Sequence, residues 1–297
     1  MPYSAIASGH VAVVTGGASG IGLAAARCFA TRGMRVAIAD LGADRLDAAR
    51  SAIAAAGAAE VLVAEVDVAD PGALAGLAAD VGARWGGADV VMLNAGIGPE
   101  SSILGPETVW QRIIDVNMWG VIHGAQAFLP GMLARGRAGL IICTGSKQGI
   151  TTPPGNPAYN VSKAGVKVFA EALEHDLRNR PDARISAHLL IPGFVFTGLT
   201  TGATEKPGAT EKPGATEKPG ATEKPAAAWT ADQTVDFMMQ SLERGDFYIL
   251  CPDNDVPRGL DEKRILWAAG DIVENRPPLS RWHKDHAEAF RAKLAEG

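Results

Sequence analysis

The segment VAVVTGGASGIGLAAARCFATRG, residues 11–33, decides how this chain folds. It starts with an apolar run, passes through the glycine-rich turn TGGASGIG, and ends in an alanine-rich stretch with apolar residues at helical spacing. This order predicts a buried strand, a tight loop and a helix. Units of this kind alternate along an α/β fold whose sheet is parallel.

The glycines of this turn have the spacing G-x-x-x-G-x-G, which suits a phosphate-binding loop. Gly16 permits the sharp turn, Gly20 lets a pyrophosphate approach the backbone, and Gly22 lets the helix pack close to the strand. The N–H groups and the positive dipole at the start of the helix attract phosphates. Glycines alone are more often an ordinary loop, but a strand before them and a helix after them favour a dinucleotide-binding site.

The next apolar run, residues 35–39, ends at Asp40, eighteen residues after Gly22. An acid at the end of the second strand accepts hydrogen bonds from both hydroxyls of an adenine ribose and repels a 2′-phosphate. Ser19 stands in the loop where a basic residue would attract that phosphate, and Arg35 lies at the far end of the strand. The alternative is that Asp40 caps the following helix. We expect the ribose role, and therefore NAD as cofactor rather than NADP.

Ser146, Tyr159 and Lys163 form a second motif, with the tyrosine thirteen residues after the serine and four before the lysine. Oxidation of an alcohol requires a base for the hydroxyl proton, a donor that holds the oxygen and a hydride acceptor. Tyr159 would shuttle the proton, and Ser146 would bind the reacting oxygen. A free tyrosine, with a pKa of about 10, is a poor base at neutral pH. Because Lys163 falls on the same helical face, its ammonium would lower that pKa.

Taken alone, this motif is better explained as two side chains on the face of an amphipathic helix and a serine at the end of a strand. The glycine turn upstream changes the balance, because a bound dinucleotide would supply the missing hydride acceptor. Together the two motifs predict a hydride-transfer site.

With both motifs in this order, the chain resembles the short-chain dehydrogenase/reductase family over residues 8–200. The turn matches TGxxxGxG, and the segment 93–96, LNAG, matches the family's NNAG with leucine in the first position. Ser146, Tyr159 and Lys163 match the catalytic serine, tyrosine and lysine. The resemblance implies a doubly wound, Rossmann-like parallel sheet with the site at the carboxyl ends of its strands.

The resemblance also implies roles for residues outside these motifs. Asn117 would link the lysine to a water-mediated proton path, and Asp67 and Val68 would contact the adenine ring. Pro192-Gly193 with Thr197 would lie along the nicotinamide, and the LNAG segment would support the cofactor. The expected catalytic residues are Asn117, Ser146, Tyr159 and Lys163. The expected cofactor contacts are Gly16, Ser19, Gly20, Ile21, Gly22, Asp40, Asp67, Val68, Asn94, Ala95, Gly96, Tyr159, Lys163, Pro192, Gly193 and Thr197.

Two segments depart from the family pattern. Gly145 replaces the first of two adjacent serines, but Ser146 keeps the spacing to Tyr159. The chain also lacks the TGxxxxVDGG strand near the C-terminus. A strand at 247–251 and a variable tail at 252–297 stand in its place.

Length and composition are consistent with a single domain over residues 1–297, since 47% of the residues are hydrophobic. The net charge of −5, with no large basic cluster, argues against nucleic acid or an anionic membrane as partner. No apolar stretch reaches spanning length and no signal peptide is recognisable, which favours a cytoplasmic location. The expected strands of the doubly wound α/β sheet are 11–14, 35–39, 61–66, 89–93, 138–143, 184–191 and 247–251.

The cysteines and histidines do not predict a metal site. Cys28, Cys143 and Cys251 are odd in number and widely spaced, which is typical of core residues in a reducing compartment. His283 and His286 would share a helical face, but no third ligand follows at a suggestive spacing.

The hexapeptide GATEKP occurs four times without change over residues 202–225. Each unit is neutral, lacks a large apolar residue and ends in proline, so it cannot build the stacked core of a solenoid. We expect a flexible or extended insertion in or beside the substrate lid. It is either an extended lid or, the interpretation we favour, a passive surface expansion. Alternatively the lid is the amphipathic helix expected at 230–244, where Thr230 and Gln233 resemble a capping box.

The residues expected around the substrate are mostly apolar, and no arginine in the sequence is placed to bind a carboxylate or phosphate. They are 97–99, Gln148, Ile150, 153–156 and 194–196. We therefore expect a neutral, moderately hydrophobic secondary alcohol or ketone as substrate. The alternatives are an NADPH-dependent ketoreductase and a catalytically silent nicotinamide-binding regulatory module. By resemblance, helices at 110–129 and 161–177 would form the interfaces of a homodimer or homotetramer.

Overall fold

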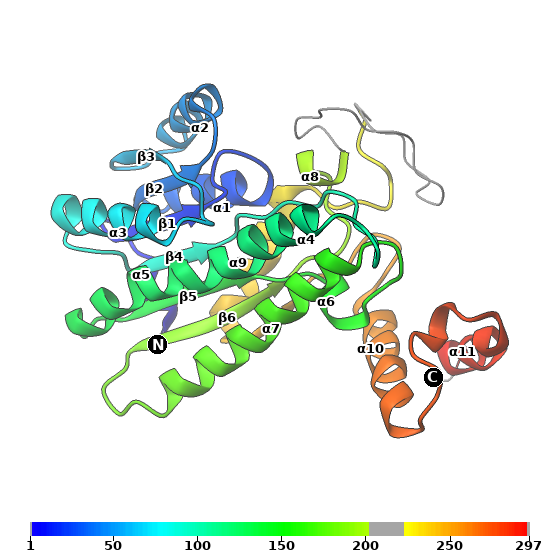
Figure 1. The fold of residues 1–297 in the computed structure, drawn as a ribbon. Coiled ribbons are helices and arrows are strands. Elements are labelled where there is room, and N and C mark those ends of the chain that lie inside the picture. Colours follow the sequence, from blue (N-terminus) through cyan, green and yellow to red (C-terminus); the bar gives the residue numbers. More distant parts are fainter. Residues whose placement is uncertain (1, 202–222, 296–297) are drawn as a thin grey trace.

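The computed structural model describes residues 2–201 and 223–295, in which seven parallel strands form a sheet covered by helices on both faces (Figure 1). The strand order is β3-β2-β1-β4-β5-β6-β7. This confirms the expected doubly wound α/β fold, and each strand begins and ends within one residue of its expected bounds. The strands are β1 (Val11–Thr15), β2 (Arg35–Asp40), β3 (Val61–Glu65), β4 (Val90–Leu93), β5 (Gly139–Thr144), β6 (Ile185–Ile191) and β7 (Tyr248–Leu250).

The strands at the centre of the sheet are apolar along their whole length because helices cover both of their faces. Every residue of β1, β4 and β5 is buried. The chain order reverses between β1 and β4, since β2 and β3 continue on one side of β1 and β4 to β7 on the other. At such a reversal the loops leave the strands in opposite directions and open a crevice at their carboxyl ends. The sequence motifs lie at that edge.

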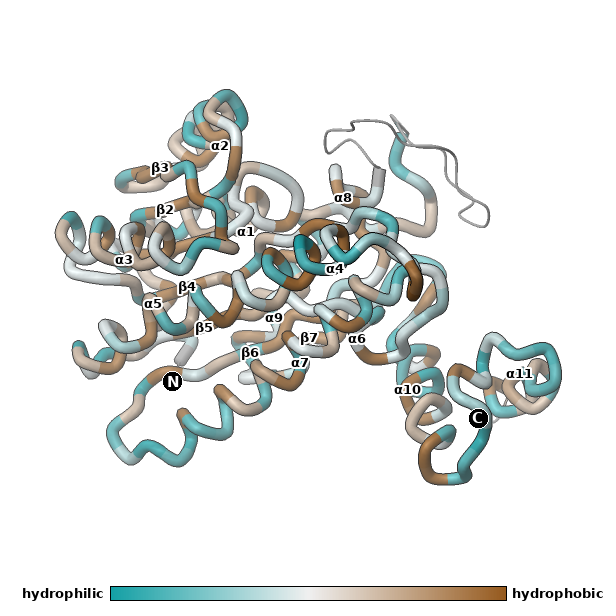
Figure 2. Tube along the Cα trace, in the orientation of Figure 1, coloured by the Kyte–Doolittle hydropathy of each residue, from teal (hydrophilic) through white to brown (hydrophobic). Residues whose placement is uncertain are grey.

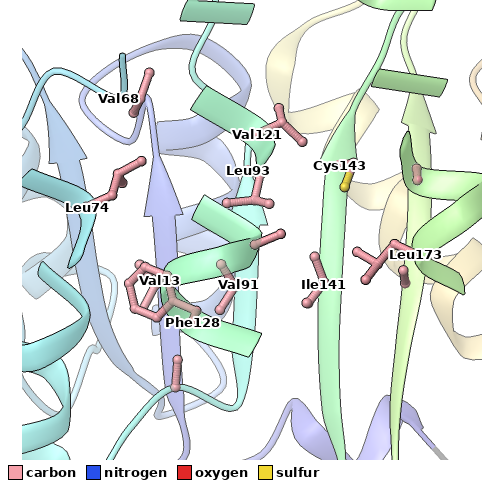
Figure 3. Close-up of a cluster of buried hydrophobic side chains, with 14 of the residues drawn as sticks. Val13, Val68, Leu74, Val91, Leu93, Val121, Phe128, Ile141, Cys143 and Leu173 are labelled. Carbon is pink, nitrogen blue, oxygen red and sulfur yellow. The ribbon is translucent and has the colours of Figure 1, made fainter. Parts of the chain in front are cut away.

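Two hydrophobic clusters fix the helices on the sheet. On one face α3, α5 and α7 pack over side chains that alternate along the strands, and Figure 3 shows Val13, Val91 and Ile141 beside Phe128 and Leu173. On the other face α1, α2 and α9 cover the remaining strand side chains, which point in the opposite direction. The helices of the described residues are η1 (Pro2–Ala5), α1 (Gly20–Ala30), α2 (Ala43–Ala55), α3 (Pro71–Trp85), α4 (Glu107–Ile114), η2 (Asp115–Trp119), α5 (Gly120–Arg135), α6 (Gln148–Thr151), α7 (Pro157–Arg178), α8 (Gly198–Thr201), α9 (Ala231–Arg244), α10 (Arg258–Val273), η3 (Ser280–Trp282), η4 (Lys284–His286) and α11 (Ala287–Ala295).

The helix expected at 230–244 is present as α9, but it is not a lid. Thr230 and Gln233 form the expected capping box at its start. Its apolar residues Val235, Met238 and Leu242 are buried against the sheet and α1. The interpretation of this segment as a lid is therefore wrong, because its apolar stripe is used in packing the core. Residues 202–222 of the repeat lie outside the described residues, and the role of the repeat stays a prediction.

The tail after β7 forms a separate helical unit that lies beside α6 and projects from the sheet (Figure 1). Trp267 of α10 is buried, and its indole N–H donates to the hydroxyl of Ser280 at 2.8 Å. Arg276 lies over the ring of Trp267, 4.2 Å from its centroid, and pairs with Asp271 at 2.9 Å. The segment around α11 is largely hydrophilic (Figure 2). These contacts hold the tail as a folded unit.

Within residues 2–201 and 223–295, no helix has both the length and the apolar character needed to cross a membrane. In the same residues, no group of three or more His, Cys, Asp or Glu side chains is arranged to hold a metal ion. All three cysteines are free.

Candidate active site

The glycine loop packs between the carboxyl ends of β1 and β4. Gly16 has a φ of +66°, and a Cβ there would lie 2.8 Å from the Cα of Ala95. A Cβ on Gly22 would overlap the carbonyl of Gly16, so both positions require glycine. Ser19 is the N-cap of α1 but makes no side-chain capping bond. The N–H groups of this helix start are therefore left for a ligand.

Asp40 lies at the end of β2 with its carboxylate facing the glycine loop. Its Oδ2 accepts a hydrogen bond from the N–H of Ala18 at 2.9 Å, and its Oδ1 accepts one from the N–H of Leu41 at 2.8 Å. The N-cap of α2 is Gly42, so the alternative of a helix-capping role for Asp40 is wrong. Sequence reasoning missed Arg45, whose guanidinium lies 3.5 Å from Oδ1 of Asp40. The first turn of α2 brings it there.

Asp67 and Val68 follow β3, and both are held in place by residues of the next helical segments. One oxygen of Asp67 accepts the N–H of Ala69 at 3.0 Å, and the other pairs with Arg112 at 2.8 Å. Val68 is buried, and a Cβ on Gly120 would lie 2.7 Å from its side chain. The sequence contained no sign of the Arg112 contact, which spans 45 positions.

Asn94 ties the ends of three strands together. Its backbone N–H donates to Oγ1 of Thr15 at 2.9 Å, and its side-chain amide donates to the carbonyl of the same residue at 3.2 Å. Its Oδ1 accepts a bond from Thr144 at 3.3 Å. Ala95 also donates to Thr15 Oγ1, at 3.2 Å. Thr15 and Thr144, which sequence reasoning missed, therefore shape the floor of the site at the ends of β1 and β5.

Asn117 is fully buried in η2, a single π-helical turn between α4 and α5. Such turns are frequent at functional sites. Its Oδ1 accepts the N–H of Ile97 at 2.7 Å, and its Nδ2 donates to the Ile97 carbonyl at 2.9 Å and to Ser162 at 3.1 Å. A Cβ on Gly96 would lie 3.3 Å from Asn117 Oδ1 and 3.5 Å from Lys163 Nζ. Asn117 and Lys163 therefore both lie close to Gly96.

Ser146, Tyr159 and Lys163 come together at the ends of β5 and α7. The Ser146 hydroxyl is close enough to Tyr159 to lower the pKa of its phenol. Asn156 and Pro157 start α7, with Oδ1 of Asn156 accepting the N–H of Tyr159 at 3.4 Å. Lys163 is buried one helical turn further on, and its Nζ lies 5.8 Å from the centre of the Tyr159 ring.

The pKa values of these groups follow from burial. Burial raises the pKa of Tyr159, and the hydrogen bond from Ser146 lowers it by less. Burial lowers the pKa of Lys163 from 10.5 to about 8. The Lys163 ammonium donates to the carbonyl of Thr144 at 2.9 Å rather than to the phenol. In the chain by itself burial outweighs the other effects, and the pKa of Tyr159 is raised rather than lowered as expected.

The segment after β6 closes the site from the opposite side. A Cβ on Gly193 would overlap the carboxylate of Asp253, whose Oδ1 accepts the N–H of Phe194 at 2.9 Å. The Pro192 carbonyl accepts the N–H of Lys147 at 3.1 Å. Thr197 reaches the glycine loop, since a Cβ on Gly20 would lie 3.1 Å from its methyl group. These contacts bring the motifs at 16–22 and 192–197 to face each other.

The residues present fit a nicotinamide dinucleotide. The start of α1 offers N–H groups to phosphates, and Asp40 offers a carboxylate to a ribose. Thr197 lies against Gly20, the first residue of α1. The site therefore has a phosphate end, a ribose end and, at Tyr159, a proton donor and acceptor.

A hollow of about 250 Å³ lies between α6 and the C-terminal tail. Lys147 and Gln148 line it from the β5 side, and Arg264 and Arg281 line it from the tail. The fold thus brings two arginines beside Gln148, one of the residues expected around the substrate. No local sequence pattern predicts the approach of these arginines to Gln148, because the tail follows α6 by more than a hundred positions.

A family model described as short chain dehydrogenase matches residues 10–208. The chain belongs to the short-chain dehydrogenase/reductase family. This confirms the resemblance seen in the sequence, and it makes the protein an oxidoreductase. A 2-(R)-hydroxypropyl-CoM dehydrogenase of Xanthobacter autotrophicus is 35% identical over 202 residues, which are 67% of this chain and 79% of that protein.

Solved structures of this family superpose on the chain. A short chain dehydrogenase/reductase from Burkholderia phymatum in complex with NAD matches with a TM-score of 0.79 at 29% identity, covering 91% of this chain and 96% of that chain. L-Sorbose reductase from Gluconobacter frateurii, complexed with NADPH and L-sorbose, matches with a TM-score of 0.60 at 34% identity, covering 64% of this chain and 72% of that chain. The two solved structures hold different cofactors, NAD in one and NADPH in the other. A preference of this chain for either cofactor therefore has to be inferred from its own residues.

Proposed function

We propose that this short-chain dehydrogenase/reductase uses NAD to interconvert a secondary alcohol and a ketone, with Tyr159 as the general acid and base. The observation that carries the proposal is that Ser146, Tyr159 and the buried Lys163 come together at the same sheet edge as the glycine loop, with Lys163 Nζ 5.8 Å from the centre of the Tyr159 ring. A hydroxyl pair with a nearby ammonium is the arrangement that holds an alcohol oxygen and removes its proton.

In the proposed reaction, Ser146 donates a hydrogen bond to the substrate oxygen and Tyr159 accepts the hydroxyl proton. A nicotinamide held in this site would supply the hydride acceptor and, when oxidised, a positive charge. Lys163 adds a second positive charge, and the two together oppose the effect of burial on the pKa of Tyr159. Asn117 supports this by fixing Ile97 and Ser162, and the latter donates to the Tyr159 carbonyl at 2.7 Å.

Asp40 supports NAD over NADP. Its carboxylate lies at the end of β2, where a 2′-phosphate would meet a negative charge. Arg45 lies 3.5 Å from Oδ1 of Asp40 and partly offsets that charge. Removal of the carboxylate would leave Arg45 free to attract the phosphate, so Asp40→Ala is expected to shift the preference towards NADP.

The test is NADH formation from NAD with a panel of secondary alcohols, run with NADP in parallel. Turnover is expected to need NAD and to fall at least 1,000-fold in Tyr159→Phe, since general acid–base groups contribute up to about 10⁴ in rate and the phenol also holds the substrate. Asp40→Ala is expected to lose NAD activity and gain NADP activity. Binding of NADH without turnover of any panel member in either direction would argue instead for a silent nicotinamide-binding module.

A further inference from the structure

The hollow between α6 and the tail carries more positive than negative charge. Lys147, Arg264 and Arg281 face Asp261 within it, and Asp253 lies just behind Lys147. Asp261 is buried, and Lys147 lies 2.6 Å from its Oδ2 and 2.9 Å from Asp253. Both carboxylates are thereby neutralised in part by one shared ammonium. One ammonium against two carboxylates leaves one negative charge, so with the two guanidinium groups the cluster has a net charge of +1.

Neither arginine is matched by a close carboxylate. Arg264 lies 3.9 Å from Oδ1 of Asp261, and its buried Nε has no hydrogen-bond partner among residues 2–201 and 223–295. Arg281 forms no ion pair within those same residues. It stacks instead on Trp282 at 4.5 Å and on Phe290 at 5.4 Å. Aromatic stacking of this kind orients a guanidinium and leaves its N–H edge for a ligand.

The pKa of Arg281 reflects this surplus of positive charge. Burial, and after it the charge of Arg264, lowers that pKa from 12.5 to about 10, while Asp261 raises it by less. The guanidinium is still charged at neutral pH. An anion between the two arginines would relieve their repulsion.

The hollow begins next to the proposed reaction site. Gln148 lines it, and the backbone N–H of Gln148 donates to Oγ of Ser146 at 3.2 Å. Its volume suits a small polar group at one end of a ligand rather than a whole substrate, since complete ligand pockets measure roughly 300–1,000 Å³. Thr151 adds a hydroxyl to the lining, and Trp282 closes it from the tail.

We propose that Arg264 and Arg281 bind an oxyanion of the substrate, a carboxylate or a sulfonate, so that the enzyme acts on a secondary alcohol with an acid group at its far end. This rests on the proposed function and names its substrate class. It replaces the neutral substrate expected from the sequence, because the two arginines come from the tail, outside the loops from which that expectation was drawn. The planar guanidinium fork suits both anions.

Turnover of matched alcohols tests the proposal. The series runs from 4-hydroxypentanoate to 7-hydroxyoctanoate, each compared with its methyl ester, with 5-hydroxyhexane-1-sulfonate as the second anion. The best hydroxy acid is expected to have a kcat/KM at least ten times that of its methyl ester. Whichever of the carboxylate and sulfonate substrates has the higher kcat/KM identifies the anion that the site prefers. Arg281→Gln and Arg264→Gln are each expected to raise KM for the acid about 10- to 100-fold, the loss of one charge-assisted hydrogen bond, and to leave the ester unchanged.

Arg291→Gln is the matched control. Arg291 is an exposed arginine of α11 that bonds the Ala287 carbonyl and does not line the hollow. Equal turnover of acids and esters by the unchanged enzyme would overturn the proposal and leave the dehydrogenase function standing. The same rise in KM for the acid in Arg281→Gln, Arg264→Gln and Arg291→Gln would also overturn it.

Binding without turnover separates the two proposals. Calorimetric titration of the chain with the hydroxy acids needs no hydride transfer. Binding that is lost in Arg281→Gln, together with no turnover of any alcohol, would support the anion site and contradict the proposed function. Acid binding that is the same in Arg281→Gln and in the unchanged chain would overturn the anion site whatever the turnover.

Discussion

At the residue scale, Lys163 is a buried ammonium, and burial of this charge lowers the free energy of unfolding of the chain. Its pKa in the folded chain is about 8, below the ordinary 10.5, because burial disfavours the charge. Below pH 8 the group is charged in both the folded and the unfolded chain, so the full penalty, roughly 3 kcal/mol, opposes folding. As the pH rises from 8 towards 10.5, the folded chain releases the proton first and the penalty shrinks. We therefore expect the unfolding free energy of the unchanged chain, measured relative to Lys163→Met, to increase by about 2 kcal/mol between pH 7 and 9.5. Denaturant titrations of the cofactor-free proteins at both pH values measure this, and the variant serves as the control for all other titrating groups. A constant difference would show that Lys163 is not desolvated.

At the element scale, the sequence predicted what neighbouring residues determine and missed what distant segments determine. Continuous apolar runs and local glycine spacing located all seven strands and the motifs at their ends. The packing of α9 on α1 and the approach of the tail to α6 depend on contacts across many tens of residues, which a local pattern does not encode. The ion cluster of Lys147 with Asp253 and Asp261 is such a contact, and it joins the ends of β5 and β6 to α10. Lys147→Met would remove the cation that two largely buried carboxylates share, leaving Asp261 with only the more distant Arg264 at 3.9 Å. We expect it to lower the unfolding free energy by about 3 kcal/mol, against less than about 1 kcal/mol for Lys167→Met, which breaks a more exposed pair with Glu171. Equal losses in urea titrations would mean that the cluster does not fasten the tail to the sheet.

At the scale of the whole molecule, apolar side chains on the outer surface of α7 support the homodimer or homotetramer expected from the family. Val161 and Val168 are 50% and 62% exposed, and their spacing of seven residues puts them on one face of the helix. Trp119, 41% exposed, belongs to η2, which packs beside α7. A single exposed apolar residue is ordinary on a protein surface, whereas a row of them along one helix favours a partner of the same chain. We expect light scattering after size-exclusion chromatography to give two or four times the chain mass, and Val168→Glu to reduce it, because the glutamates would be buried at the interface without a partner. Leu266→Glu provides the comparison, since Leu266 is 66% exposed on α10, away from that face. A monomer at micromolar concentration, or an equal effect of the two substitutions, would contradict an interface on α7.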